Sequence, residues 1–285
     1  MGMLYSTKPF PVKEYVPIAK NYYALREEWI NMTPQSRHLE MCAFVAGRRK
    51  QLMFTGQSAC AFYNIPRLDK YEMRPNCISE KVKGSDVIRW HYGPLDVQAK
   101  TVNKFLVAGP IRTLCDLAKY DDSKSLLVSI NHCLNKDLFN IKELSTEIEN
   151  QTGMRNRKLL QRLLRFANDK CESPLETIAW IEIYNAGFVL PQQQVNFYND
   201  HKFLGRVDMY WEIRNRKIVL ELDGKAKLFS GEDLFKEKRR EDQIRQLGCE
   251  FIRVDWDEVK SGELVKKLSA LSIPTRRYRA NTIPT

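Results

Sequence analysis

The stretch that decides the fold of this chain is FLGRVDMYWEIRNRKIVLELDGKAK, residues 203–227. Two runs with strand-like alternation flank a polar segment, Glu212 to Lys217, and this pattern predicts a β-hairpin. A turn centred on Arg214 and Asn215 sets the antiparallel register. That register pairs Trp211 with Ile218, Met209 with Leu220 and Val207 with Leu222, so one face of the hairpin is wholly apolar.

The opposite face of this hairpin gathers carboxylates. Asp208 falls directly opposite Glu221, with Cβ atoms about 5 Å apart, and Asp223 follows on the same face. Like charges directly opposite each other destabilise a sheet, and such a conflict is expected at a functional site. A hard cation such as Mg²⁺ or Mn²⁺ resolves the conflict because it takes oxygen ligands. We therefore expect Asp208, Glu221 and Asp223 to be metal ligands.

Lysines follow these carboxylates at once, at Lys225 and Lys227. Carboxylates, a metal and a lysine are the equipment for in-line displacement at a phosphate. The metal lowers the pKa of a bound water, and Lys225 orients that water or stabilises the transition state. The alternative is that the acids are simply solvated on the exposed face of a hairpin.

The motifs GRVDM, VLELDGKAK, FKEKRREDQIRQLG and CEFIRVDWDEV together resemble the nuclease-like domain related to the very-short-patch repair endonucleases, within the PD-(D/E)xK superfamily. The resemblance covers about residues 171 to 271. It implies that Asp208 is the first metal-binding acid and Glu221 the acid of the second motif. It also matches Glu176, in SPLE, to a glutamate on the first helix of the domain.

Two of these assignments have alternatives. The superfamily's lysine would fall at position 223, where this chain has Asp, so Asp223 is either a third ligand or the replacement of that lysine, with Lys225 as a displaced lysine. Ser173-Pro174-Leu175-Glu176 is also an ideal helix start, with Ser at the N-cap and Glu at N3. This cap explains Glu176 without any catalytic role.

Composition points to a polyanionic partner. The chain has 285 residues, enough for two domains, and its 46 Lys and Arg outnumber 35 Asp and Glu, which gives a net charge of +11. Its seven cysteines are odd in number and form no CxxC pair, which argues against a disulfide framework or zinc site and favours a reducing compartment. No apolar run approaches the ~20 residues of a membrane span.

The N-terminal half reads as alternating short elements. A helix is expected from Ile18 to Ile30, another over 36–50, and a short one from Thr55 or Gly56 to Pro66. Short strands are expected around 76–79, 87–92 and 104–107, and amphipathic helices from Pro110 and over 123–138. From SACAFYNIP through AGPIRTLCDLA to about 168, the chain resembles the C-terminal part of AbiEi-like antitoxins of type IV toxin–antitoxin systems.

Two basic helices are candidates for contact with nucleic acid. Residues 154–168, MRNRKLLQRLLRFAN, place leucines on one side and cations on the other, and Arg155, Arg157, Lys158 and Arg162 could follow a phosphate backbone. A solvated outer face explains the same pattern equally well. On the helix expected from Ser230 or Asp233 to Leu247, Lys236 or Arg240 would face the scissile phosphate, with Lys227 nearby; ion pairing within that helix is the alternative.

The sequence thus predicts an α+β protein with two domains. Residues 1–170 form an AbiEi-like regulatory or binding domain, residues 171–271 a PD-(D/E)xK-like mixed sheet flanked by helices, and 272–285 a basic tail. The expected function is that of a cytoplasmic, Mg²⁺- or Mn²⁺-dependent endonuclease acting on DNA. The alternative is a non-catalytic antitoxin or transcriptional regulator that keeps the nuclease fold as a scaffold. A toxin or another protein is then a further candidate partner, and no membrane is involved.

Overall fold

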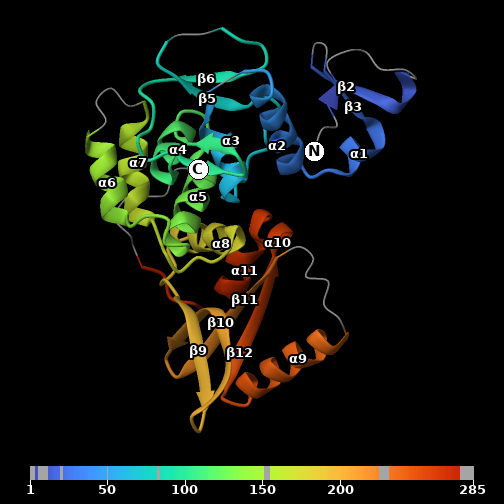
Figure 1. Ribbon diagram of the computed structural model, residues 1–285. Coiled ribbons are helices and arrows are strands. Elements are labelled where there is room, and N and C mark those ends of the chain that lie inside the picture. Colours follow the sequence, from blue (N-terminus) through green and yellow to red (C-terminus); the bar gives the residue numbers. More distant parts are fainter. Residues whose placement is uncertain are drawn as a thin grey trace. The chain divides into compact units, whose positions relative to one another are not determined.

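The computed structural model describes residues 4–5, 12–19, 22–49, 51–81, 84–150, 155–224 and 231–276. The chain divides into two compact units, Met1–Ala167 and Asn168–Thr285, so the division falls after residue 167 rather than after residue 170. Both units combine helices with sheets, which confirms the α+β class (Figure 1). Within the described ranges, every helix is too short or too polar to span a bilayer.

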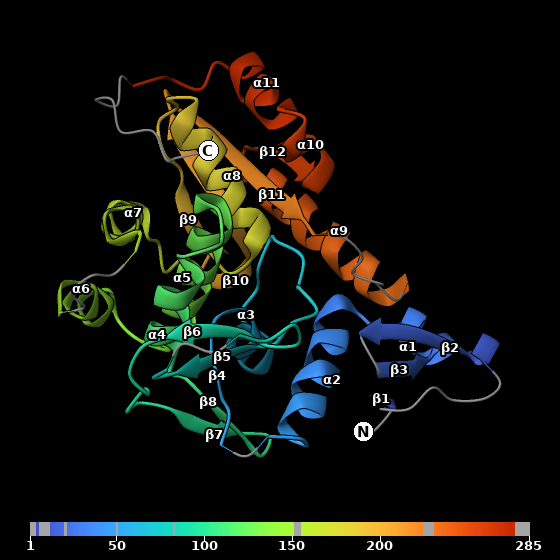
Figure 2. The same cartoon turned by 90° about the horizontal axis from the view of Figure 1, so that it is seen from above.

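The first unit contains two sheets. The smaller has the strand order β1-β3-β2, and the larger has the order β6-β5-β4-β8-β7. The strands are β1 (Leu4–Tyr5), β2 (Tyr15–Ala19), β3 (Tyr22–Leu25), β4 (Met53–Phe54), β5 (Asn76–Ser79), β6 (Arg89–Tyr92), β7 (Lys100–Val102) and β8 (Phe105–Val107). Figure 2 shows the larger sheet from above with α2 beside it.

The first unit also contains helices. They are α1 (Arg26–Asn31), α2 (Pro34–Ala46), α3 (Gly56–Tyr63), α4 (Pro110–Leu117), α5 (Ser123–Asn135), α6 (Ile141–Asn150) and α7 (Arg157–Leu163), with 3₁₀ turns at Val12–Glu14 and Leu164–Phe166. One buried cluster joins α2, α3 and the strands through Phe44, Phe62, Phe54 and Val107. Each of the expected helix starts at Gly56, Pro110 and Ser123 is present; the helix expected over 154–168 is shorter and ends in a 3₁₀ turn.

The helix predicted over Ile18 to Ile30 is wrong. This stretch forms strand β2, strand β3 and only then the short helix α1. The reason is visible in the spacing of its apolar residues, because Val16, Ile18 and Ala24 face one cluster with Met41. That alternation has a period of two, which suits a strand rather than a helix.

The second unit is built on one four-stranded sheet with the order β12-β11-β10-β9. Its strands are β9 (Gln192–Asn199), β10 (Lys202–Ile213), β11 (Arg216–Asp223) and β12 (Cys249–Asp255), and β11 pairs with β12 in parallel. The predicted hairpin register is confirmed, since Trp211 pairs with Ile218 and Met209 with Leu220. Arg214 and Asn215 both have positive φ, at 50° and 65°, as a two-residue type I′ turn requires.

Helices flank this sheet, namely α8 (Pro174–Asn185), α9 (Gly231–Arg245), α10 (Trp256–Lys260) and α11 (Glu263–Ala270). Helix α9 packs against β10 and β12, and its Ile244 joins Tyr210 and Val219 in a buried cluster. The carboxylate-bearing face of the hairpin is therefore covered. Helices α10 and α11 are separated at Ser261-Gly262, where Gly262 adopts a φ of 79°.

Candidate metal-dependent active site

Asp208 and Glu221 lie on adjacent strands of the second unit, one register step beyond the pair formed by Met209 and Leu220. Asp208 Oδ2 accepts a hydrogen bond from the backbone N–H of Leu222 at 2.8 Å. The Asp208 carboxylate is thereby turned toward β11 at the point where the paired ladder of the hairpin ends. A backbone hydrogen bond from β11 thus holds the carboxylate of Asp208, the residue predicted to lie opposite Glu221.

Glu221 is only 8% exposed, and its environment opposes ionisation. Burial raises the pKa of its carboxyl to about 7, with the negative charge of Asp208 adding to the effect and Arg240 opposing it. Glu221 is therefore not solvated on an open face, in contrast to the alternative interpretation of these acids. A carboxyl forced toward the neutral form by a neighbouring carboxylate is the arrangement that a bound cation would relieve.

Glu176 reaches the same region from α8. Its side chain is buried, and burial together with the charge of Asp208 raises the pKa of its carboxyl, while hydrogen bonds lower it. The N-cap role is also present, because Ser173 Oγ accepts from the Glu176 N–H at 3.2 Å. The Glu176 carboxylate accepts from the backbone N–H of Glu172, one residue before the N-cap. Helix capping and proximity to Asp208 are thus compatible.

Gln194 belongs to this group but was not identified from the sequence. Its Nε2 donates to Glu176 Oε2 at 2.8 Å, and the register of β9 with β10 places it opposite Asp208. Gln194 has a φ of 54°, a left-handed conformation that is unusual inside a strand. The signal that could have found it is the run of three amides, Gln192 to Gln194, where a strand should alternate.

Arg240 on α9 closes the other side of Glu221. Its Nη2 donates to Glu221 Oε1 at 3.1 Å and to Glu237 Oε1 at 2.6 Å, while Nη1 donates to the backbone carbonyl of Arg206. Gly205 makes room for this side chain, since a Cβ there would lie 2.6 Å from Arg240 Cδ. The buried Nε of Arg240 has no hydrogen-bond partner among the residues that the structure describes. A positive group therefore occupies one side of the carboxylate pair.

Asp223 is placed differently from the other acids. Both of its carboxylate oxygens accept from Arg253 Nη1, at 3.0 and 3.3 Å, and its side chain is 53% exposed. Arg253 also binds Glu241 and Glu237 of α9. Asp223 thus belongs to a chain of ion pairs through Arg253, whereas Glu176 is the further acid whose carboxyl feels the charge of Asp208.

The remaining predicted residues divide between the units. Lys225 and Lys227 lie outside the described residues, and Lys236 is exposed on α9. In the first unit, Arg155, Lys158 and Arg162 are exposed, whereas Arg157 is half-buried and donates to the carbonyl of Glu149 at 3.0 Å. These four cations lie at and just before α7, on a unit separate from the carboxylates.

The donor set of the site suits a hard cation. Asp208 and Glu221 offer carboxylate oxygens, and Mg²⁺ commonly binds one or two carboxylates with water and substrate phosphate completing its shell. The Arg240 guanidinium already places a positive charge beside Glu221. Among the described residues, no three His, Cys, Asp or Glu side chains form a metal-binding group. A cation held by Asp208 and Glu221 would therefore need water or substrate for the rest of its shell.

Comparison with known proteins adds no relative. The sequence matches no family model, and neither the curated proteins nor the solved structures show significant similarity to it.

Proposed function

We propose that this protein is a metal-dependent endonuclease that hydrolyses phosphodiester bonds in DNA. The observation that carries the proposal is the pairing of buried Glu221 with half-buried Asp208, in which burial and the Asp208 charge raise the Glu221 pKa to about 7. A bound Mg²⁺ or Mn²⁺ would supply a water of lowered pKa and a positive charge beside the phosphate. The resemblance to the nuclease-like domain of very-short-patch repair endonucleases supports the same chemistry.

Each residue of the site has a role in this proposal. Asp208 and Glu221 hold the cation, and the backbone N–H of Leu222 fixes the orientation of the Asp208 carboxylate. Glu176, held by Gln194, adds negative charge beside Asp208 and strengthens the attraction for the cation. Arg240 is a candidate donor to a phosphate oxygen once the cation takes over its interaction with Glu221. Asp223 and Arg253 brace α9 against the sheet.

DNA is the substrate that the charge of the chain favours. A net charge of +11 attracts a polyanion over a range of several ångströms and raises the rate of encounter. Arg155 and Lys158, exposed just before and on α7, are candidates for sequence-independent contacts with phosphates.

One observation favours the alternative of a non-catalytic regulator. The Arg240 guanidinium compensates the charge of Glu221 without any metal, so the carboxylates have a structural explanation as well. In that case the fold would serve as a scaffold for binding nucleic acid or a partner protein. Metal-dependent cleavage separates the two functions.

The deciding experiment incubates plasmid and single-stranded DNA with the protein in Mg²⁺, Mn²⁺ or EDTA. Asp208→Asn is the informative variant, because an amide oxygen can still accept from the Leu222 N–H and preserve the local fold. Asp200→Asn, in the exposed turn between β9 and β10, is the matched control. We expect cutting by wild type and control in metal only, and none by Asp208→Asn. Equal cutting by all three proteins, or none with metal, would contradict the proposal.

A further inference from the structure

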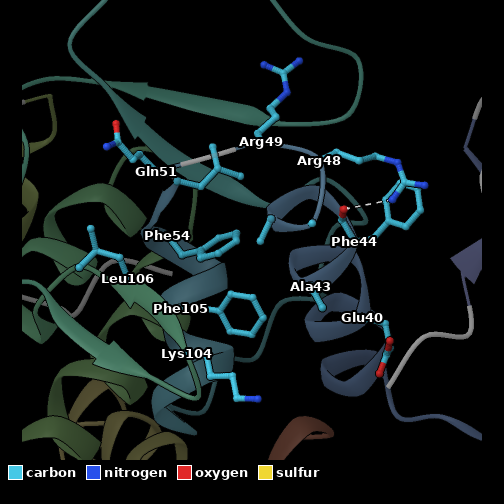
Figure 3. A pocket seen from close by; sticks show the side chains of 13 residues that line it. Glu40, Ala43, Phe44, Arg48, Arg49, Gln51, Phe54, Lys104, Phe105 and Leu106 are labelled. Carbon is cyan, nitrogen blue, oxygen red and sulfur yellow. Dashed lines mark hydrogen bonds between the residues drawn. The ribbon is translucent and has the colours of Figure 1, made fainter.

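The first unit carries a groove of about 770 Å³ that none of the catalytic residues lines. It runs between the end of α2, the loop 47–52, β4 and the β7–β8 turn. Figure 3 shows aromatic side chains in its interior and basic side chains around it, among them Phe54, Phe105, Arg48, Arg49 and Lys104. Its volume is in the range of established ligand sites.

The charge of the groove is positive. Arg48, Arg49 and Lys104 are exposed on its rim, and Glu40 is its single acid. Within the part of the chain that the structure describes, none of these three cations is ion-paired with a carboxylate. This differs from the second unit, where Arg240, Arg245 and Arg253 are all held by glutamates. The rim of the groove thus has uncompensated positive charge to offer an anion.

Aromatic packing holds the interior of the groove rigid. Phe105 is half-buried, and its ring packs edge-on against Phe54 at 5.9 Å and contacts Phe62 at 5.3 Å. The Arg48 guanidinium lies 3.5 Å from the centre of the Phe44 ring. Lys104 reaches the rim because it adopts a φ of 74° in the β7–β8 turn. The groove thus brings together the Phe105 ring, the Arg48 guanidinium that packs on Phe44, and the Lys104 ammonium.

We propose that this groove binds single-stranded DNA, with a base stacked on Phe105 and phosphates bound by Arg48, Arg49 and Lys104. Sequence-independent binding of single strands combines a positive groove with aromatic stacking, and both are present here. An acidic peptide would also be attracted, but it would need acids at suitable spacing, whereas a nucleic acid presents a phosphate at every residue. The site is separate from the carboxylates and does not depend on the proposed cleavage.

The test is fluorescence anisotropy of a labelled twelve-residue oligothymidine with the full chain in EDTA, so that cleavage plays no part. Lys104→Glu reverses a charge in an exposed turn, and Phe105→Leu keeps an apolar side chain but removes the ring. Lys142→Glu is the matched control, because Lys142 is exposed in the first turn of α6, away from the groove, where an acid suits the helix dipole. Circular dichroism melts verify that each variant is folded.

We expect Lys104→Glu to weaken binding at least tenfold and to lower the slope of log affinity against log salt by about one. Phe105→Leu should weaken binding roughly tenfold with an unchanged salt slope. Lys142→Glu should bind as wild type. Unchanged affinity in both groove variants, equal loss in Lys104→Glu and Lys142→Glu, or normal binding by Phe105→Leu would overturn the proposal. An oligoglutamate peptide that binds where oligothymidine does not would assign the groove to an acidic protein instead.

Discussion

Arg240 Nη2 lies 3.1 Å from Glu221 Oε1, and this ion pair places a side-chain cation beside the carboxylates that we propose as metal ligands. The same guanidinium group binds Glu237 at 2.6 Å and the Arg206 carbonyl at 2.9 Å. Both partners of the pair are largely buried, with side-chain exposures of 20% for Arg240 and 10% for Glu221. The proposed metal ion would therefore compete with Arg240 for the same negative charge.

We therefore predict that metal binding stabilises the Arg240→Gln variant more than it stabilises wild type. Without metal, the variant leaves Glu221 beside Asp208 with no cation, which should lower the free energy of unfolding by about 1–3 kcal/mol. Saturating Mn²⁺ should then raise its Tm by roughly 5 °C more than it raises that of wild type. Thermal melts with Mn²⁺ and with EDTA measure both quantities.

The control for this prediction is Arg245→Gln, which removes an ion pair with Glu241 on the same helix. It should leave the metal-induced change in Tm at the wild-type value. An equal rise in Tm for all three proteins would show that Arg240 does not share the site with the metal.

We predict a steric coupling between Gly205 on β10 and Arg240 on α9. A Cβ at this position would lie 2.6 Å from Arg240 Cδ and 2.8 Å from Cγ, so Gly205→Ala should cost about 1–3 kcal/mol of unfolding free energy. The cost should largely vanish in Arg240→Ala, where those atoms are absent. A double-mutant cycle by urea unfolding measures the coupling.

Gly224→Ala is the matched control, since a Cβ at Gly224 would meet none of the described residues within 4 Å. An equal cost for Gly205→Ala in the wild-type and Arg240→Ala backgrounds would locate the strain in the backbone instead of in the arginine.

The hairpin could be predicted from sequence because its signals are local. Alternation fixed which residues share a face, and Arg214 and Asn215 marked the turn, so the pairing of Trp211 with Ile218 followed directly. The same reasoning placed Asp208 beside Glu221. Failure came where two periods compete over a short stretch, as in Ile18 to Ile30, where tyrosines and alanines are compatible with helix or strand.

The rest of the site could not be predicted from sequence because it depends on tertiary contacts. Nothing in the local pattern around Asp223 indicates that Arg253, thirty residues later, binds both of its oxygens. The contribution of Gln194 depends on the packing of α8 near β9, which brings Glu176 within 2.8 Å of its amide. The resemblance pointed to Glu176, but only the structure shows that the charge of Asp208 helps to raise the pKa of the Glu176 carboxyl.

We predict that substitution of Asp116 strongly destabilises the first unit. It is 1% exposed and accepts from Thr55 Oγ1 at 2.7 Å, Arg112 Nε at 2.9 Å and Lys119 Nζ at 2.5 Å. Although burial opposes ionisation, the hydrogen bond and charge of His91 and the charges of Arg112 and Lys119 hold its pKa well below the usual range. Asp116→Asn should therefore lower the free energy of unfolding by about 3–5 kcal/mol.

Urea unfolding followed by circular dichroism measures this loss. Asp69→Asn is the control, because the Asp69 side chain is 40% exposed and 3.9 Å from Arg67, and its loss should cost less than about 0.5 kcal/mol. A small effect of Asp116→Asn would mean that the surrounding cations reach solvent easily.

Glu221 predicts a characteristic dependence of stability on pH in the absence of metal. Its pKa of about 7 lies above the ordinary value of 4.5, so between these limits the folded protein binds more protons than the unfolded chain. The stabilisation of the folded state by this extra proton is therefore complete below pH 4.5. It is lost as the pH rises toward 7, which lowers the free energy of unfolding by on the order of 3 kcal/mol. Glu221→Gln should remove this loss, so its stability relative to wild type should increase from pH 5 to pH 8 in EDTA. Urea unfolding at each pH measures the difference, and a constant difference would show that Glu221 is ionised throughout.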